Sequence, residues 1–193
     1  MSDVSRETSA SLAHFKALVI DENKRQNLVS PASLVDFDTR HLADGAQLAE
    51  LGKPGSWCDV GSGAGLPGIV IAIITGAPMT LIEPRKLRAD FLRRAVSELG
   101  IDARVSEQKA ERVPEHFDNI TARAVAELSR LFAITEHLAQ RGTRWILPKG
   151  KSAQMELAAA EQSWQGVFTL VPSRTGEAAM ILIAEGVRRR GKR

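Results

Sequence analysis

The sequence has few of the features that mark secreted, metal-binding or membrane-spanning proteins. Its single cysteine, Cys58, has no partner within the chain for a disulfide. The four histidines show no ligand spacing with each other or with Cys58, so we expect no metal site. No apolar run approaches the roughly 20 residues of a membrane span, and no signal peptide is visible at the start. These absences predict a cytoplasmic protein without a membrane partner.

Size and composition predict one ordinary globular domain, which we expect to be a monomer. The chain has 193 residues, 44% hydrophobic and 25% charged. We divide it into a helical preface (1–54), a core (55–186) and a basic tail (187–193). Without five basic residues of the tail, the net charge of +3 disappears, because 21 basic residues then face 23 acidic ones. The tail either contacts phosphates or only solubilises the chain end. Those five residues are Arg188, Arg189, Arg190, Lys192 and Arg193.

Short apolar runs alternate with longer amphipathic runs, which is typical of a parallel sheet flanked by helices. The last two strands are separated only by a turn containing Pro and Gly, so we expect an antiparallel hairpin at the sheet edge. In the preface we expect two or three helices, with turns near Ser30-Pro31 and Gly45. The expected strands are 57–60, 79–82, 103–105, 119–122, 144–147, 166–171 and 179–184. The expected helices of the core are 68–75, 86–99, 127–140 and 152–164.

A glycine-rich loop follows the first expected strand and opens a helix. Glycines allow positive φ and let backbone N–H groups approach a ligand closely. Two cofactor patterns overlap in this loop. Gly63, Gly65 and Gly68 fit the dinucleotide pattern G-x-G-x-x-G. The pattern for S-adenosylmethionine (SAM), an acid followed by three alternating glycines, is fitted by Asp59, Gly61, Gly63 and Gly65.

Two acidic residues at strand ends favour SAM. A carboxylate at Asp59 attracts the sulfonium and ammonium groups of SAM and repels the phosphates of a dinucleotide. Glu83, at the end of the next strand, is placed to accept hydrogen bonds from ribose hydroxyls. The alternative is that Asp59 only caps the turn. Together with the terminal hairpin, these residues predict an α/β fold of the class I, Rossmann-like SAM-dependent methyltransferases.

Three stretches in order resemble the bacterial small-subunit rRNA guanine-N7 methyltransferase family, also called glucose-inhibited division protein B. They are DVGSGAGLPG at 59–68, ITARAVAEL at 120–128 and LPKG at 147–150, preceded by Asn27-Leu28 and by Arg40-His41-Leu42 with Asp44. The resemblance implies methylation of a guanine N7 in 16S rRNA, naked or within the small subunit. The N-terminal region is shorter than in the family, and Glu83 stands where the family more often has Asp.

The resemblance also implies roles for particular residues. Gly61 and Leu66 are expected to contact SAM, and Ala110-Glu111 to flank its adenine, although Glu111 is alternatively an ordinary solvated acid. Arg123 is expected in the active site and also among the cofactor-binding residues, at the carboxyl end of a strand where open α/β sheets bind ligands. The alternative for Arg123 is a salt bridge, perhaps to Asp118.

The expected chemistry needs alignment more than proton transfer. Guanine N7 carries a lone pair and no proton, so we expect no general base. Arg123 and Lys149 are the expected catalytic residues, holding a phosphate or the guanine oxygen. Lys149 is alternatively an ordinary strand-end lysine. A basic face that either binds phosphate or is merely solvated comprises Arg85, Lys86, Arg88, Arg93 and Arg94.

Two other functions remain open from the residues. A SAM-dependent methyltransferase acting on a small molecule or protein would share every cofactor feature. An NAD-linked oxidoreductase or a non-catalytic nucleotide-binding module would use Gly63, Gly65 and Gly68. Only the ARAV and LPKG stretches and the basic tail argue against the first alternative, whereas Asp59 and the terminal hairpin argue against the second.

Overall fold

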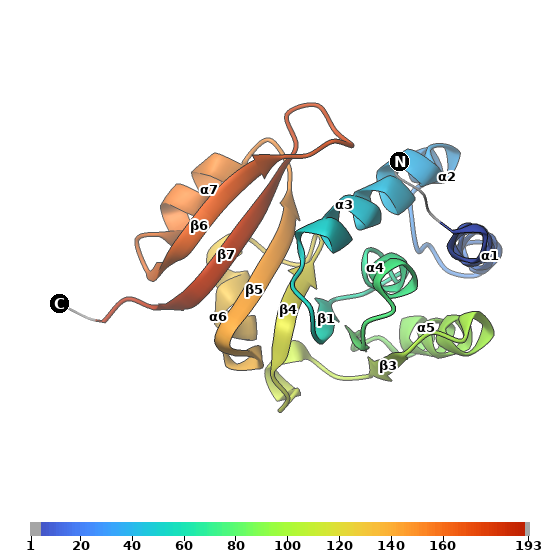
Figure 1. Ribbon diagram of the computed structural model, residues 1–193, viewed down its shortest axis with the longest axis horizontal. Helices are drawn as coiled ribbons and strands as arrows, with labels where there is room; N and C mark the ends of the chain where they lie inside the picture. The colour runs from blue at the N-terminus through green and yellow to red at the C-terminus, as the bar shows by residue number, and fades with distance from the viewer. Residues whose placement is uncertain (1–4, 192–193) are drawn as a thin grey trace.

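The protein forms a seven-stranded sheet with helices on both faces, in a computed structural model that describes residues 5–191 (Figure 1). The strand order is β3-β2-β1-β4-β5-β7-β6. Strands β1 to β5 pair in parallel, whereas β7 is antiparallel to both β5 and β6. The strands are β1 (Trp57–Val60), β2 (Met79–Ile82), β3 (Ala103–Ser106), β4 (Phe117–Ala122), β5 (Ala139–Lys149), β6 (Trp164–Pro172) and β7 (Met180–Arg189).

Two apolar clusters attach the helices to opposite faces of the sheet. One face is covered by α1 (Arg6–Glu22), α3 (Asp44–Leu51), α4 (Gly68–Thr75) and α5 (Lys86–Leu99), which pack around Trp57 and Leu81. The other is covered by α6 (Leu128–Thr135) and α7 (Ala153–Ala160), around Trp145 and Trp164. Shorter elements are α2 (Pro31–Val35), the π-helix η1 (Asp38–Ala43) and the 3₁₀ turns η2 (Ala110–Arg112) and η3 (Glu136–Leu138).

The predicted fold class is confirmed. The α/β sheet ends in the expected antiparallel hairpin, and helices of the preface pack on the sheet. Strands β1 and β2 and helices α4 and α5 have the predicted bounds. Both helices end at glycines in the left-handed conformation, Gly76 (φ +63°) and Gly100 (φ +59°), which is a common way to terminate a helix.

The helices predicted at 127–140 and 152–164 are too long. Helix α6 ends at Thr135 and α7 at Ala160, and β5 begins at Ala139 rather than at 144. The early start of β5 contains an irregularity, because pairing with β4 jumps from Phe117↔Ala139 to Asn119↔Arg144. The Thr143 hydroxyl stabilises it by donating to the Phe117 carbonyl oxygen at 2.6 Å. The amphipathic pattern of the sequence runs on past the helix end, because no proline marks the turn that follows.

The strands β3, β4 and β6 extend by one to three residues beyond their predicted bounds, and larger differences occur at Gly45 and in the tail. Gly45 lies inside α3 rather than at a turn, and a Cβ there would collide with the Val70 side chain of α4. Close packing of the two helices therefore explains this glycine. Strand β7 continues to Arg189, into the segment predicted as a tail, and the Arg189 guanidinium lies 5.0 Å from the centre of the Trp164 ring. The basic residues at 192 and 193 lie outside the described part.

Within residues 5–191, none of the helices combines sufficient length with sufficient apolar character to span a bilayer.

Candidate functional site

The predicted site residues gather at the edge of the sheet where the parallel strands end. The glycine loop follows β1, Glu83 follows β2, and Arg123 follows β4, while Lys149 is the last residue of β5. Because β7 is antiparallel to both of its neighbours, β6 runs in the same direction as β5. The turn from β6 to β7 therefore lies at this edge too. Open α/β sheets bind ligands at this carboxyl edge.

The loop between β1 and α4 requires glycine for two physical reasons. Gly61, Gly63 and Gly65 have φ values of +70°, +55° and +81°, which side chains rarely adopt. A Cβ on Gly65 would lie 2.6 Å from Ile69 Cδ1, and one on Gly68 would lie 2.7 Å from Asp59 Oδ2. The loop is therefore held tightly against β1 and α4, with its backbone free of side chains.

Asp59 caps the loop and keeps one carboxylate oxygen unpaired. Its Oδ2 accepts a hydrogen bond from the Gly68 N–H at 3.1 Å, and its side chain is 1% exposed. Its Oδ1 is buried and has no hydrogen-bond partner among the described residues. Burial raises the pKa of Asp59 to about 7, against the lowering effect of the Gly68 N–H. A buried, unpaired carboxylate oxygen suits a cationic ligand, and SAM carries a sulfonium and an ammonium group.

Glu83 connects the loops after β1 and β2. Its Oε2 accepts from the Gly63 N–H at 3.0 Å, and its Oε1 accepts from the Arg85 N–H at 2.9 Å. A carboxylate oxygen can accept two hydrogen bonds, and each of these oxygens accepts one. Both therefore retain capacity for ribose hydroxyls.

The remaining predicted cofactor residues differ in exposure. Leu66 is 4% exposed and its side chain belongs to the core, so its backbone is the part that a cofactor can reach. Ala110 is 6% exposed, in the 3₁₀ turn η2 after β3, and its carbonyl oxygen lies 3.1 Å from His137 Nε2. Its neighbour Glu111 is exposed.

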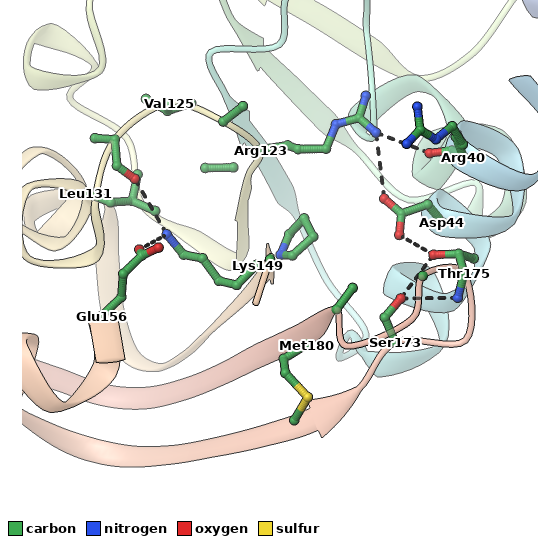
Figure 2. Close-up of a pocket in the computed structure, with 17 residues that line it drawn as sticks. Arg40, Asp44, Arg123, Val125, Leu131, Lys149, Glu156, Ser173, Thr175 and Met180 are labelled. Atoms are coloured by element: carbon green, nitrogen blue, oxygen red, sulfur yellow. Dashed lines mark hydrogen bonds and ion pairs between the residues drawn. The ribbon is translucent and has the colours of Figure 1, made fainter. Parts of the chain in front are cut away.

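Arg123 is held by the helical preface. Its NH1 donates to His41 Nδ1 at 3.0 Å. The same nitrogen donates to the Arg40 carbonyl oxygen at 3.4 Å and lies 3.7 Å from Asp44 Oδ2 (Figure 2). The alternative pairing with Asp118 is wrong, because Asp118 instead binds Ser56 at the opposite end of β4. Burial, together with the positive charge of the Arg123 guanidinium, lowers the pKa of His41 to about 4. His41 is therefore neutral at physiological pH.

Lys149 and Arg123 line one cavity of about 420 Å³ (Figure 2). The Lys149 Nζ lies 2.9 Å from Glu156 Oε2 and 3.5 Å from the Ala126 carbonyl oxygen. Val125 also lines the cavity, and a Cβ on Gly61 would lie 2.7 Å from its Cγ2. Val125 therefore packs over the glycine loop, and the cavity lies beside that loop.

Part of the cavity wall was missed from the sequence. Besides the predicted pair, the wall includes Arg40, Asp44, Glu156, Ser173, Thr175 and Met180. The direction of β6 could have indicated the turn residues. A strand that runs parallel to β5 ends at the carboxyl edge, so the turn that follows it lies there.

Asp59→Asn is expected to change how the stability of the SAM-free protein depends on pH. The folded-state pKa is raised from the reference value of 3.8 to about 7. The stabilising contribution of the protonated carboxyl is therefore complete below about pH 4 and is lost as pH rises through about 7, at up to about 1.4 kcal/mol per pH unit. Thermal unfolding of both proteins at about pH 5 and about pH 8 measures the effect. The variant should gain stability relative to the wild type at the higher pH, and a constant difference would contradict the assignment.

Metal binding has no visible basis within residues 5–191. No group of three or more His, Cys, Asp or Glu side chains there is arranged to hold an ion.

The fold is shared with known methyltransferases. A SAM-dependent methyltransferase from Aquifex aeolicus superposes with a TM-score of 0.61 at 14% identity, covering 84% of this chain and 96% of its own. A ribosomal protein L11 methylase from Lactobacillus delbrueckii subsp. bulgaricus gives a TM-score of 0.55 at 22% identity, with coverage of 76% and 79%. Strand order, glycine loop and strand-end acids together define a class I SAM-dependent methyltransferase.

The sequence comparisons narrow this class to one family. The family model for rRNA small subunit methyltransferase G matches residues 8–174. Proteins named ribosomal RNA small subunit methyltransferase G are 43% identical in Rhizorhabdus wittichii, over 98% of this chain and 90% of theirs, and 42% identical in Cereibacter sphaeroides, over 93% and 91%. The chain belongs to the rRNA small subunit methyltransferase G family, which confirms the resemblance drawn from its motifs.

Proposed function

We propose that this protein transfers the methyl group of SAM to the N7 of a guanine in 16S rRNA, in the cytoplasm. The observation that carries this proposal is the cavity beside the glycine loop, which places Arg123 and Lys149 next to the expected cofactor position. The names of its relatives supply the class of acceptor, small-subunit rRNA.

The residues of the loop suit SAM, which supplies an electrophilic methyl group on a sulfonium when bound. The free Oδ1 of Asp59 is available to a cationic group, and Glu83 is available to the ribose hydroxyls. The backbone of the loop approaches the cofactor without side chains, because its three glycines at 61, 63 and 65 have positive φ.

The acceptor side needs alignment rather than a base. N7 attacks with its own lone pair, so the protein must hold N7, the methyl carbon and the sulfur in line, and positioning of this kind supplies roughly 7 to 11 kcal/mol. Arg123 and Lys149 provide hydrogen-bond donors for the guanine oxygen or a flanking phosphate. A base reaches such a cavity only from a single-stranded or splayed segment, because the major groove of duplex RNA is too narrow.

The acceptor class is tested with methyl-labelled SAM and small ribosomal subunits from bacteria that lack their own member of this family. We expect the label to remain with the RNA after the ribosomal proteins are removed, from assembled subunits, from naked 16S rRNA or from both. Label recovered only in protein or in small molecules would overturn the proposal and favour a different acceptor.

The basic face around α5 is only partly available to RNA. Lys86 pairs with Asp90, Arg93 pairs with both Asp90 and Glu107, and Arg94 pairs with Glu22. Arg85 is exposed at the start of α5 and has no ion pair among residues 5–191. The phosphate-binding candidates are thereby reduced to Arg85 and its neighbour Arg88.

Arg85→Ala is expected to weaken RNA binding in a salt-dependent manner. One lost phosphate contact lowers the slope of log affinity against log salt by about 0.7 to 0.9. The slope is measured by titrating 16S rRNA at several salt concentrations. Arg93→Ala is the matched control, because that guanidinium is already paired with carboxylates and its loss should leave the slope nearly unchanged. Equal slopes for Arg85→Ala and the wild type would remove Arg85 from the interface.

A further inference from the structure

We propose that His41 and Asp44, both in the helical preface, are positioning residues that orient the Arg123 guanidinium in the active site. His41 comes from η1 and Asp44 begins α3, whereas Arg123 follows β4, more than 75 residues further along the chain. The preface would then be part of the catalytic apparatus. The activity readout of this proposal rests on the proposed methyl transfer, and a second readout below is independent of it.

All the contacts of Arg123 with the preface are made by one of its nitrogens. NH1 donates to His41 Nδ1 and the Arg40 carbonyl oxygen and faces Asp44 Oδ2. Within residues 5–191, neither Nε nor NH2 has a hydrogen-bond acceptor from the protein. The preface therefore fixes one nitrogen of the planar guanidinium. The donors on Nε and NH2 remain available to a ligand of the cavity.

The protonation pattern of His41 points to a role beyond packing. A guanidinium has no acceptor, so His41 Nδ1 must be unprotonated and its Nε2 must carry the hydrogen. That Nε2 is buried and has no partner among the described residues, while the whole residue is only 6% exposed. Unpaired buried donors are rare, and a phenylalanine would pack against Phe37 without leaving one. The hydrogen bond from Arg123 to Nδ1 accounts for a histidine at this position.

Asp44 connects Arg123 to the opposite wall of the cavity. Its Oδ1 accepts from Gln47 Nε2 at 2.9 Å. The same oxygen accepts from the Thr175 hydroxyl at 3.0 Å, and Oδ2 is turned toward Arg123 (Figure 2). Gln47 also binds Ser173 in the turn between β6 and β7. The preface therefore fixes Arg123 and the turn of the hairpin with one polar network, and both line the same cavity.

Three substitutions separate positioning from packing. His41→Phe keeps the ring and removes the Nδ1 acceptor, so we expect unchanged or raised thermal stability but at least a tenfold lower kcat/KM for methyl transfer. His41→Asn restores an acceptor near the Nδ1 position and should recover part of that loss. Asp44→Asn keeps the side-chain shape, removes the charge and should also reduce transfer. His14→Phe is the matched control, since His14 is exposed on α1 and should tolerate the change.

A double-mutant cycle shows whether His41 acts on methyl transfer through Arg123. In an Arg123→Lys background, His41→Phe should cost much less than in the wild type, because the interaction that it disrupts is already altered. An equal cost in both backgrounds would overturn the proposal, as would wild-type activity of both His41→Phe and Asp44→Asn. SAM affinity, measured by calorimetry without RNA, is the independent readout, and we expect His41→Phe but not His14→Phe to weaken it. If the wild type binds SAM but does not methylate rRNA, the proposed acceptor fails while this readout still decides the positioning role.

Discussion

Arg123→Ala is expected to lower kcat/KM for methyl transfer to 16S rRNA by roughly 100- to 1000-fold, the usual cost of removing one preorganised donor from an active site. Arg123 lies at the junction of the cavity, the preface and the loop after β4, so its loss removes both a donor of the cavity and the contact with His41. Single-turnover transfer from labelled SAM measures the loss. A parallel thermal melt shows whether the variant remains folded.

Arg144→Ala is the matched control for this substitution. The Arg144 side chain is 28% exposed, close to the 25% of Arg123, and its NH1 also donates to a carbonyl oxygen of the preface, that of Leu51. It lies away from the cavity, because its other partner is Glu185 within the sheet. We expect it to lower stability while leaving kcat/KM nearly intact. Wild-type turnover by Arg123→Ala, or equal losses for the two variants, would remove Arg123 from the site.

Gly65→Ala is expected to reduce SAM affinity by at least tenfold and to destabilise the fold. The alanine would adopt φ +81° at a cost of about 1 to 2 kcal/mol. Its Cβ would also lie 2.6 Å from Ile69 Cδ1 and 3.2 Å from Leu92 Cδ2, so the loop must move away from α4. Calorimetric titration with SAM measures the affinity, and thermal unfolding measures the stability.

Gly76→Ala separates backbone strain from distortion of the loop. Gly76 has φ +63°, and a Cβ there would meet no atom within 4 Å. The alanine should therefore cost a similar ~1 to 2 kcal/mol, the usual penalty for that conformation, without changing SAM affinity. If Gly65→Ala binds SAM like Gly76→Ala, the glycine loop is not the cofactor site.

Much of the fold could be predicted because its sequence signals are local. Strand β1, the glycine loop and α4 follow one another within 20 residues, and the hairpin of β6 and β7 is closed by a short turn. The errors arose where contacts between distant parts of the chain determine the local structure. The irregularity at residues 140–143 is stabilised by Thr143 bonding to Phe117, and Gly45 is explained by Val70 of another helix. Neither partner is near in sequence.

The candidate site likewise contains residues that the sequence could predict and residues that it could not. Asp59 and Glu83 could be predicted because the acids stand directly at the ends of strands in a known pattern. The partners of Arg123 could not, since His41 and Asp44 reach it from helices about 80 residues earlier. The Lys149 pair with Glu156 and the cavity wall at Thr175 depend on how α7 and the hairpin turn are packed. Motifs therefore predicted the position of the glycine loop, and the three-dimensional arrangement was needed to define the cavity beside it.

The most direct test of the proposed reaction is identification of the methylated nucleoside. Small subunits and naked 16S rRNA that lack the modification are incubated with this protein and methyl-labelled SAM, and the RNA is digested to nucleosides. We expect label in 7-methylguanosine, and strand cleavage chemistry specific for that nucleoside should locate it in 16S rRNA. Label in any other nucleoside, or none in RNA from either substrate, would contradict the proposed reaction.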